Sequence, residues 1–378
     1  MSTHYFKSSM SEPSNWGSPN AVFEQSRWTS LPILNMFRRK VLRQQVKALE
    51  SVASQVWEIA PETTQVEPRA YYLPNQMERV TNCGFASDDW HQRMEGGLVK
   101  THSPTRGFLL KDAWLLDGVV YKERACAYLQ PRKKTMPLLN ADIEIAQAAL
   151  YATASGIKYF GQWLIDDCVT YSLAQAYGAP VTTDKKMSNH GLAYEQCFGM
   201  QPYRLQSAYF KELVIFDDVG QNKNKRERFS ALGAKMLAGI EVKPHPGVYI
   251  LRGRSGVLRQ LKNEIEIAEH LRDTRGFRIL DPMQEDLATI IRTCAGAETI
   301  VGVEGSHIIH GMLLLPKGGS VLIIQPPDRF GTVIKDLSDR DGQHFGFVVG
   351  MPSGDGFTSS IEEIERTLDM MPKLAQST

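Results

Sequence analysis

The segment that decides the fold runs from Thr299 to Phe330 and reads TIVGVEGSHIIHGMLLLPKGGSVLIIQPPDRF. It begins with an apolar, β-branched run of strand length, which ends at the polar tripeptide Glu304-Gly305-Ser306. An apolar helical stretch, a turn of small residues and a second apolar run follow. This order predicts two buried parallel strands joined by a helix, and ligands of open α/β sheets bind where such strands end. A plain βαβ crossover with a polar turn stays open as the alternative.

The chain from about Val242 onward alternates strand-like and helical patterns. Five strands and a terminal helix are predicted at residues 247–251, 277–280, 299–303, 320–324, 345–349 and 360–371. This alternation is typical of a doubly wound α/β sheet.

The first part of the chain is less regular. Residues 1–32 are rich in Ser, Pro and Asn, so we expect an irregular leader. Residues 35–56 space apolar side chains at helical intervals beside the basic residues 38–40, which predicts a basic amphipathic helix. Such a helix either packs on its own domain or lies on an anionic membrane or a partner.

Residues 61–130 hold short β-rich runs with a hairpin signal at Asp117-Gly118, so we expect an antiparallel insertion there. Further elements are predicted as helices at residues 142–154 and 159–177, a strand at 212–216 and a basic helix after Gln221.

Glycine and proline cluster at residues 233–246, which marks the joint between two predicted domains. The sequence therefore predicts an N-terminal α/β domain over residues 33–240, carrying the β-rich insertion, and a C-terminal doubly wound domain over 241–378. Two such domains facing each other leave a cleft.

Composition narrows the class of protein. A length of 378 residues favours two domains, and 43 basic against 42 acidic residues leave a net charge of +1. This balance provides no overall field for binding nucleic acid. The five widely spaced cysteines contain no C-x-x-C pair, which predicts reduced thiols and a cytoplasmic location. No signal peptide or spanning helix is expected.

The stretch YILRGRSGVLRQLKNE, residues 249–264, is the first candidate for chemistry. A strand delivers Arg252 and Arg254 to the sheet edge, and Arg259 follows in the next helix. Guanidiniums and helix N-termini both bind phosphate, so we expect a diphosphate site, with a solvated loop as the alternative. Asn263 either braces Arg259 or caps a neighbouring loop.

The second candidate follows the next predicted strand, where Glu304, Gly305, Ser306 and His310 cluster. Ser306 is predicted to cap the helix, Gly305 to let a ligand approach the backbone, and His310 to share a helix face with Ser306. A nucleotide fits such a surface. The alternative for His310 is a helix histidine bonded to a carbonyl group.

The third candidate is GIKYFGQWLIDD, residues 156–167. In a helix, Gln162 and Asp166 share one face while Trp163 supplies apolar packing. Asp166 is then a candidate general base across the cleft, and a solvated surface carboxylate is the alternative.

Several common motifs are absent from the sequence. It contains no G-x-G-x-x-G after a strand, no G-x-x-x-x-G-K-[ST], no G-x-S-x-G and no H-E-x-x-H. Asp339-Arg340-Asp341 has the spacing of a metal-binding pair, but its polar, Gly-flanked setting predicts a surface turn.

With these blocks in order, the chain resembles glycosyltransferase family 61, in particular bacterial members associated with capsular or extracellular polysaccharide synthesis. The similarity covers about residues 157–349. It rests on Arg252 with RQLKNE at 259–264, on Gly276-Phe277 before a strand, and on VGVEGSHIIH followed by LLLPKGGSVLIIQPP.

The chain departs from the family pattern at three positions. Glu304 stands where the family has the histidine of an H-G pair, and His310 where it has an asparagine. In the first domain, GQWLIDD keeps Trp163 and Asp166 but has Gln162 where a histidine is usual.

The resemblance implies a GT-B-like pair of Rossmann-type domains facing a cleft, with metal-independent, inverting transfer and no cofactor. A UDP-linked sugar is the expected donor, and a glycan or lipid-linked acceptor in polysaccharide biosynthesis the expected partner. Asp166 is the expected base, with Gln162 and Trp163 on the acceptor side. The donor and its diphosphate are expected to contact Arg252, Arg254, Arg259, Asn263, Glu304, Gly305, Ser306 and His310.

The expected location is the cytoplasm, with association to the inner face of the membrane or to a polysaccharide-assembly complex as a further option. Two other functions stay open from the sequence. Gln162 in place of histidine favours a non-catalytic sugar-nucleotide or glycan binding subunit, and an unrelated α/β nucleotide-dependent enzyme is the third possibility.

Overall fold

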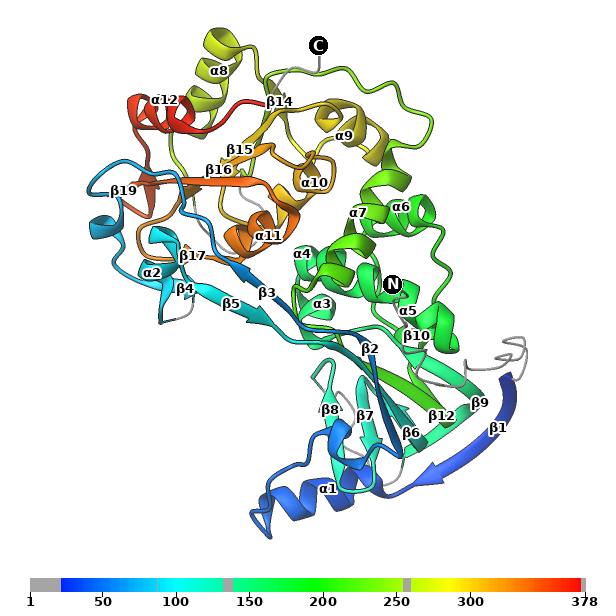
Figure 1. Cartoon of the computed structure of the whole chain (residues 1–378). Helices are drawn as coiled ribbons and strands as arrows, with labels where there is room; N and C mark the ends of the chain where they lie inside the picture. The colour runs from blue at the N-terminus through cyan, green and yellow to red at the C-terminus, as the bar shows by residue number, and fades with distance from the viewer. Residues whose placement is uncertain (1–21, 87, 132–138, 254–259, 375–378) are drawn as a thin grey trace, which may run out of the picture.

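The computed structural model describes residues 22–86, 88–131, 139–253 and 260–374. Arg254 and Arg259, two of the predicted diphosphate ligands, lie outside these ranges. The described chain forms a mixed α/β structure built around two large sheets (Figure 1). The predicted α/β class is thereby confirmed.

The second half of the chain forms a five-stranded sheet in the order β14-β13-β15-β16-β18, and all neighbouring strands are parallel. The five predicted strands are confirmed as β13 (Val248–Ile250), β14 (Arg278–Leu280), β15 (Thr299–Val303), β16 (Ser320–Gln325) and β18 (His344–Val349). Its helices are α8 (Glu264–Arg275), α9 (Leu287–Cys294), α10 (Ile309–Met312), α11 (Val333–Asp341) and α12 (Ile361–Met370).

Both faces of this sheet are covered. Side chains of a strand alternate between faces, so Val248 and Ile250 join the core cluster that includes α9 and α10. Tyr249 points the other way, into a cluster with Ile267 of α8 and Leu368 of α12. Burial on both faces explains why these strands are continuous apolar runs.

The connections of the sheet reverse direction beside β13. The chain passes from β13 to β14 on one side and then returns to place β15 on the other side. In open α/β sheets, this reversal opens a crevice at the carboxyl ends of the two strands. The predicted turns after residues 251 and 303 therefore meet at this crevice.

The first half is organised by a nine-stranded mixed sheet, in which β12 runs parallel to β9 and antiparallel to β6. Its central strands are β6 (Thr105–Leu116), β9 (Leu139–Leu150) and β12 (Ser207–Asp217). The flanking strands are β1 (Val22–Thr29), β2 (Gln55–Ala60), β7 (Val119–Lys122), β8 (Ala125–Tyr128), β10 (Ala179–Thr183) and β11 (Tyr203–Leu205).

Helices of this half include α1 (Leu31–Lys40), α3 (Ala154–Lys158), α4 (Phe160–Gln162), α5 (Cys168–Tyr177), α6 (Asn189–Phe198) and α7 (Lys223–Leu237). Between α4 and α5 the backbone forms a π-helical turn, η3 (Trp163–Asp167). The helix predicted over residues 159–177 is thus present, with this turn inside it, and so is the basic helix after Gln221. No helix in the described ranges is long and apolar enough to span a bilayer.

Several sequence predictions for this half were wrong. The helix predicted at residues 142–154 is strand β9, because pairing with β1 and β10 on one edge and β12 on the other outweighs the helix propensity of its alanines. Part of the predicted irregular leader is β1, which pairs with β9. The helix predicted at 35–56 ends at Lys40, and β2 begins at Gln55.

One other prediction needs correction. The Asp339-Arg340-Asp341 motif is the end of α11 rather than a surface turn, and Arg340 is buried with its guanidinium on the Asp341 carboxylate.

The middle of the β-rich insertion packs against the second half of the chain. There β4 (Cys83–Phe85) pairs with β17 (Phe330–Gly331) (Figure 1).

The insertion reaches the second sheet through the antiparallel strands β3 (Thr63–Val66) and β5 (Val99–His102). We call residues 67–95 the crossover segment. At its start, the Tyr71 amide donates to the Phe345 carbonyl at 2.9 Å and the Phe347 amide to the Tyr71 carbonyl at 3.0 Å. In its helix α2 (Trp90–Glu95), Arg93 is buried between the Glu67 and Asp336 carboxylates.

Replacing Arg93 by alanine should destabilise the protein by about 3 kcal/mol, because it leaves the buried Glu67 carboxylate without its guanidinium. Urea unfolding followed by fluorescence measures the loss. Arg272→Ala is the matched control, since Arg272 lies on the surface and contacts only its neighbour Asp273 among the bonds described. Equal midpoints for Arg93→Ala and wild type would show that the crossover segment does not need this ion pair.

Candidate active site

A cavity of about 640 Å³ opens at the crevice of the five-stranded sheet, which is the size of many small-molecule sites. Both halves of the chain line it. The first half contributes Ser155, Lys158, Tyr159, Phe160, Gly161, Gln162, Ile165, Ser188 and His190. The second half contributes Arg252, Pro282, Met283, Glu304, Gly305, Ser306, His307, Ile309, His310, Arg329, Val333 and Ile334.

The end of β13 is held by one buried carboxylate. Glu264, the first residue of α8, accepts the backbone N–H groups of Arg252 and Gly253, each at 2.8 Å. Burial raises the pKa of the Glu264 carboxyl group against the effect of these two donors. The bonds fix the direction in which the chain leaves β13, and so the position of Arg252.

The Arg252 side chain links this strand end to the next. Its Nη1 donates to the Glu304 carbonyl oxygen at 3.1 Å, across the crevice between β13 and β15. Burial lowers the pKa of Arg252, although the nearby Glu264 carboxylate acts in the opposite direction. Arg252 is also one of the residues that line the cavity.

The turn after β15, which Arg252 contacts, requires a glycine at residue 305. Its φ of +154° lies in a region that favours glycine, and a Cβ atom there would collide with Arg252 Nη1. The sequence predicted that this glycine would let a ligand approach the backbone. In the structure, the space beside it is taken by the guanidinium of Arg252.

Ser306 does not cap a helix as predicted. The N-cap position belongs to Gly305, and Ser306 begins the short 3₁₀ turn η4 (Ser306–Ile308), which runs into α10. Its exposed side chain faces Gly161 of α4, where an added Cβ would lie 2.8 Å from Ser306 Oγ. The absence of a side chain at Gly161 therefore lets the two halves of the chain meet at the cavity.

His310 is buried in an aromatic cluster at the cavity wall. Its ring stacks on Phe160, with centroids 5.1 Å apart, and its Nδ1 lies 2.7 Å from the Tyr194 hydroxyl of α6. The bond goes to this hydroxyl, not to a backbone carbonyl. Burial, together with nearby His190, lowers the pKa of His310 to about 3, so the ring is neutral near pH 7.

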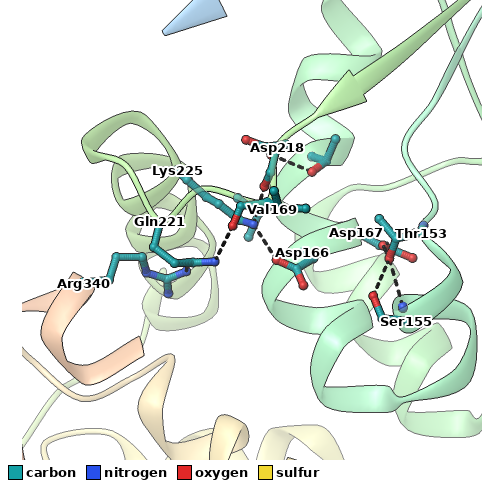
Figure 2. Close-up of polar contacts among 12 residues, drawn as sticks. Thr153, Ser155, Asp166, Asp167, Val169, Asp218, Gln221, Lys225 and Arg340 are labelled. Carbon is teal, nitrogen blue, oxygen red and sulfur yellow. Dashed lines mark hydrogen bonds and ion pairs between the residues drawn. The ribbon is translucent and has the colours of Figure 1, made fainter. Parts of the chain in front are cut away.

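Gln162 and Asp166 have different surroundings. Gln162 lines the cavity, whereas Asp166 is not among its lining residues and accepts a bond from the buried Lys225 of α7, with Oδ1 and Nζ 2.5 Å apart (Figure 2). Asp166 lies inside the π-helical turn η3, which begins directly after Gln162.

The remaining predicted residues lie away from the cavity lining. Trp163 is buried in the core beside Phe160 and Tyr194. Asn263 caps a neighbouring loop, donating to the Ser359 carbonyl at 2.9 Å and accepting the Ser359 amide at 3.2 Å. This is one of the two roles that the sequence left open for it.

Sequence reasoning missed His190 and Arg329, which both line the cavity. His190 lies in the first turn of α6, behind the N-cap Ser188, and its Nε2 is 2.8 Å from the Glu285 carbonyl oxygen. A carbonyl only accepts, so Nε2 carries the proton, and Nδ1 of the neutral ring is an acceptor. Arg329 follows β16 and provides a second guanidinium near Arg252.

One signal for His190 was available in the sequence. Ser188-Asn189-His190 combines a helix cap with a histidine, but nothing local relates it to the sheet edge more than 60 residues away. Within the described ranges, no three His, Cys, Asp or Glu side chains are grouped to hold a metal ion.

Comparison with known protein families gives one match. Residues 160–322 match the family model described as Glycosyltransferase 61, a range that runs from α4 into β16 and includes the turns of both sheet-edge strands. The chain therefore carries a glycosyltransferase family 61 domain, and the prediction that it is an enzyme is confirmed. No curated protein matches the chain.

The burial of His310 predicts a loss of stability in acid. An unfolded histidine has a pKa of about 6.5 and the folded His310 about 3, so between these values only the unfolded chain binds the proton. The stability that the neutral, buried ring allows is therefore complete above about pH 6.5. Below that pH, the free energy of unfolding falls by up to about 1.4 kcal/mol per pH unit. His310→Asn should remove this slope in urea unfolding series, whereas His270→Asn should keep it. An unchanged slope in His310→Asn would contradict the assignment.

Proposed function

We propose that the protein transfers a sugar from a nucleotide-sugar donor to a glycan or lipid-linked acceptor, with the donor in the crevice between β13 and β15. The observation that carries this proposal is the cavity itself. Most of its lining residues belong to the glycosyltransferase 61 domain, it lies at the edge of a doubly wound sheet where such folds bind nucleotides, and two guanidiniums line it.

The donor's diphosphate is assigned to Arg252 and Arg329. Guanidiniums bind phosphate oxygens through paired N–H donors and stay charged at any working pH. As the nucleoside diphosphate departs, the same two cations stabilise the developing negative charge, the electrostatic role that a metal plays in other transferases. Transfer is proposed to need no metal. Arg254 and Arg259 stay predictions, since they lie outside the described residues.

The rest of the donor is assigned to the turn after β15 and to the aromatic side chains at the cavity wall. Ser306 presents an exposed hydroxyl, and neutral His310 stacked on Phe160 offers a flat surface at the cavity wall. We propose a GT-B-like use of the two halves, with the donor on the five-stranded sheet and the acceptor entering beside Gln162. A UDP-linked donor, inverting transfer, a cytoplasmic location and a role in polysaccharide biosynthesis complete the proposal.

His190 is proposed as the group that accepts the acceptor's proton. It lines the cavity from the acceptor side, and its Nδ1 is left as an acceptor by the bond from Nε2 to Glu285. Gln162, where a histidine is usual in the family, has no basic nitrogen. Asp166, the base expected from sequence, stays a prediction, and its bond to Lys225 outside the cavity lining weighs against it.

Donor binding is tested with Arg329→Ala and isothermal titration of nucleoside diphosphates, UDP first, with and without EDTA. We expect the variant to bind about ten- to a hundredfold more weakly, because a hydrogen bond to a charged group is worth about 1.5–3 kcal/mol. Arg366→Ala, an exposed arginine on α12, should leave affinity unchanged. If no nucleoside diphosphate binds wild type, or Arg329→Ala binds as well as wild type, the donor site is wrongly placed.

The proton acceptor is tested by comparing His190→Asn with Asp166→Asn in single-turnover release of nucleotide from the donor identified above. His190→Asn should lower the rate about a hundredfold or more at unchanged donor affinity, and Asp166→Asn should stay within a fewfold of wild type. Thermal unfolding of both variants confirms that they are folded, since Asp166→Asn leaves the buried Lys225 ammonium without its carboxylate. The opposite ranking would return the role to Asp166.

A further inference from the structure

The chain around α1 exposes a group of large apolar side chains. The exposed fractions are 49% for Phe37, 60% for Val41 and 51% for Leu42, and Leu34, Met36 and Val46 are exposed as well. The opposite side of α1 docks on the protein, with Pro32 and Asn35 buried and Asn35 Nδ2 donating to the Glu123 carbonyl at 3.2 Å. A contiguous exposed apolar surface marks a binding site for another apolar surface.

The same stretch is strongly basic. Residues 31–48 contain five arginines or lysines and no acidic residue, although the whole chain has a net charge of only +1. These five are Arg38, Arg39, Lys40, Arg43 and Lys47. Exposed apolar groups with cations around them are the composition of segments that lie in the interface of an anionic bilayer.

A cavity lined by basic residues lies beside α1. Its volume is about 230 Å³, and Arg38, Arg39, Lys47 and Arg124 line it together with the amide side chains of Asn35, Gln44 and Gln45. All four charged groups are cations. Guanidinium and ammonium groups in this arrangement suit a phosphate group, and the adjoining apolar side chains suit the chains attached to it.

This surface lies far from the active-site cavity. Helix α1 sits at the end of the nine-stranded sheet that is remote from the five-stranded sheet (Figure 1). No lining residue is shared by the two cavities.

We propose that residues 34–47, together with Arg124, form a membrane-docking surface for anionic phospholipid. Phe37, Val41 and Leu42 enter the boundary between headgroups and acyl chains, and the basic cavity holds a lipid phosphate. The inference goes beyond the proposed function and does not depend on it. It explains why six large apolar side chains are left on the surface of one short segment.

The test is flotation of the full-length protein with two kinds of vesicle, one of phosphatidylcholine alone and one of equal parts phosphatidylcholine and phosphatidylglycerol. The protein should float with the mixed vesicles and not with the neutral ones. Each basic residue near an anionic surface contributes about 1 kcal/mol, so Arg39→Glu with Lys40→Glu should weaken binding at least about tenfold. Phe37→Ser with Leu42→Ser should weaken it by a similar factor through lost apolar burial.

Matched control variants test whether the loss of vesicle binding is specific to this surface. Val219→Ser with Ile265→Ser changes two apolar residues that are just as exposed but lie elsewhere, and Lys243→Glu changes an exposed lysine elsewhere. These variants should float like wild type, and nucleoside diphosphate affinity should stay unchanged in all variants. Equal binding to both vesicles, no binding to either, or equal losses in the controls would each overturn the proposal.

The same variants and vesicles distinguish two other occupants of this surface, a small anion and a second copy of the chain. A small anion is distinguished by isothermal titration with inorganic phosphate. Phosphate binding by a protein that fails to float with the mixed vesicles would mean a small-anion site and not a membrane surface. Sedimentation velocity should give the same mass for wild type and Phe37→Ser with Leu42→Ser. A wild-type dimer that this double variant dissociates would mean that a second copy covers the surface, and would also overturn the proposal.

Discussion

The geometry of the active-site cavity depends on the two backbone N–H groups that the Glu264 carboxylate binds. Those bonds set the course of the chain after β13, which places Arg252, and the Arg252 guanidinium then binds the carbonyl of Glu304 at the end of β15. Because the guanidinium fills the space beside residue 305, any side chain there would have to displace it, and the φ of +154° also favours glycine. A single buried carboxylate thus fixes the turn after β13 and, through it, the guanidinium that links the ends of the paired strands β13 and β15.

The five-stranded sheet was predictable because its signals are local. Strands buried on both faces are continuous apolar runs, and the polar residues that follow them mark where each strand ends. Strand β9 was not predictable on the same terms. Its alanine-rich sequence favours a helix, and only its pairing with β1, β10 and β12, all distant or later in the chain, makes it a strand.

The residues of the candidate site also fall into two groups, those that could be predicted from the sequence and those that could not. Arg252, Gly305 and His310 follow strands whose order could be read from the sequence, so their meeting at one edge was expected. Asp166 was placed on the cavity face from its helical spacing, whereas in the structure its carboxylate is bonded to Lys225, a partner that residue spacing does not reveal. His190 and Arg329 reach the cavity through tertiary packing, which residue spacing does not encode.

The crossover segment has a mechanical consequence. The chain passes from one sheet to the other and back through β3 and β5, and passes once more after α7, while Tyr71 is hydrogen-bonded to β18 and β4 pairs with β17. Any rotation that widens the cavity must bend the β3–β5 ribbon and the irregular segment after α7 together. Three chain crossings define a hinge axis more strictly than the single linker that the sequence suggested. The freedom left to the two halves is therefore a narrow rocking about that axis, and not the swivelling of two bodies on one tether.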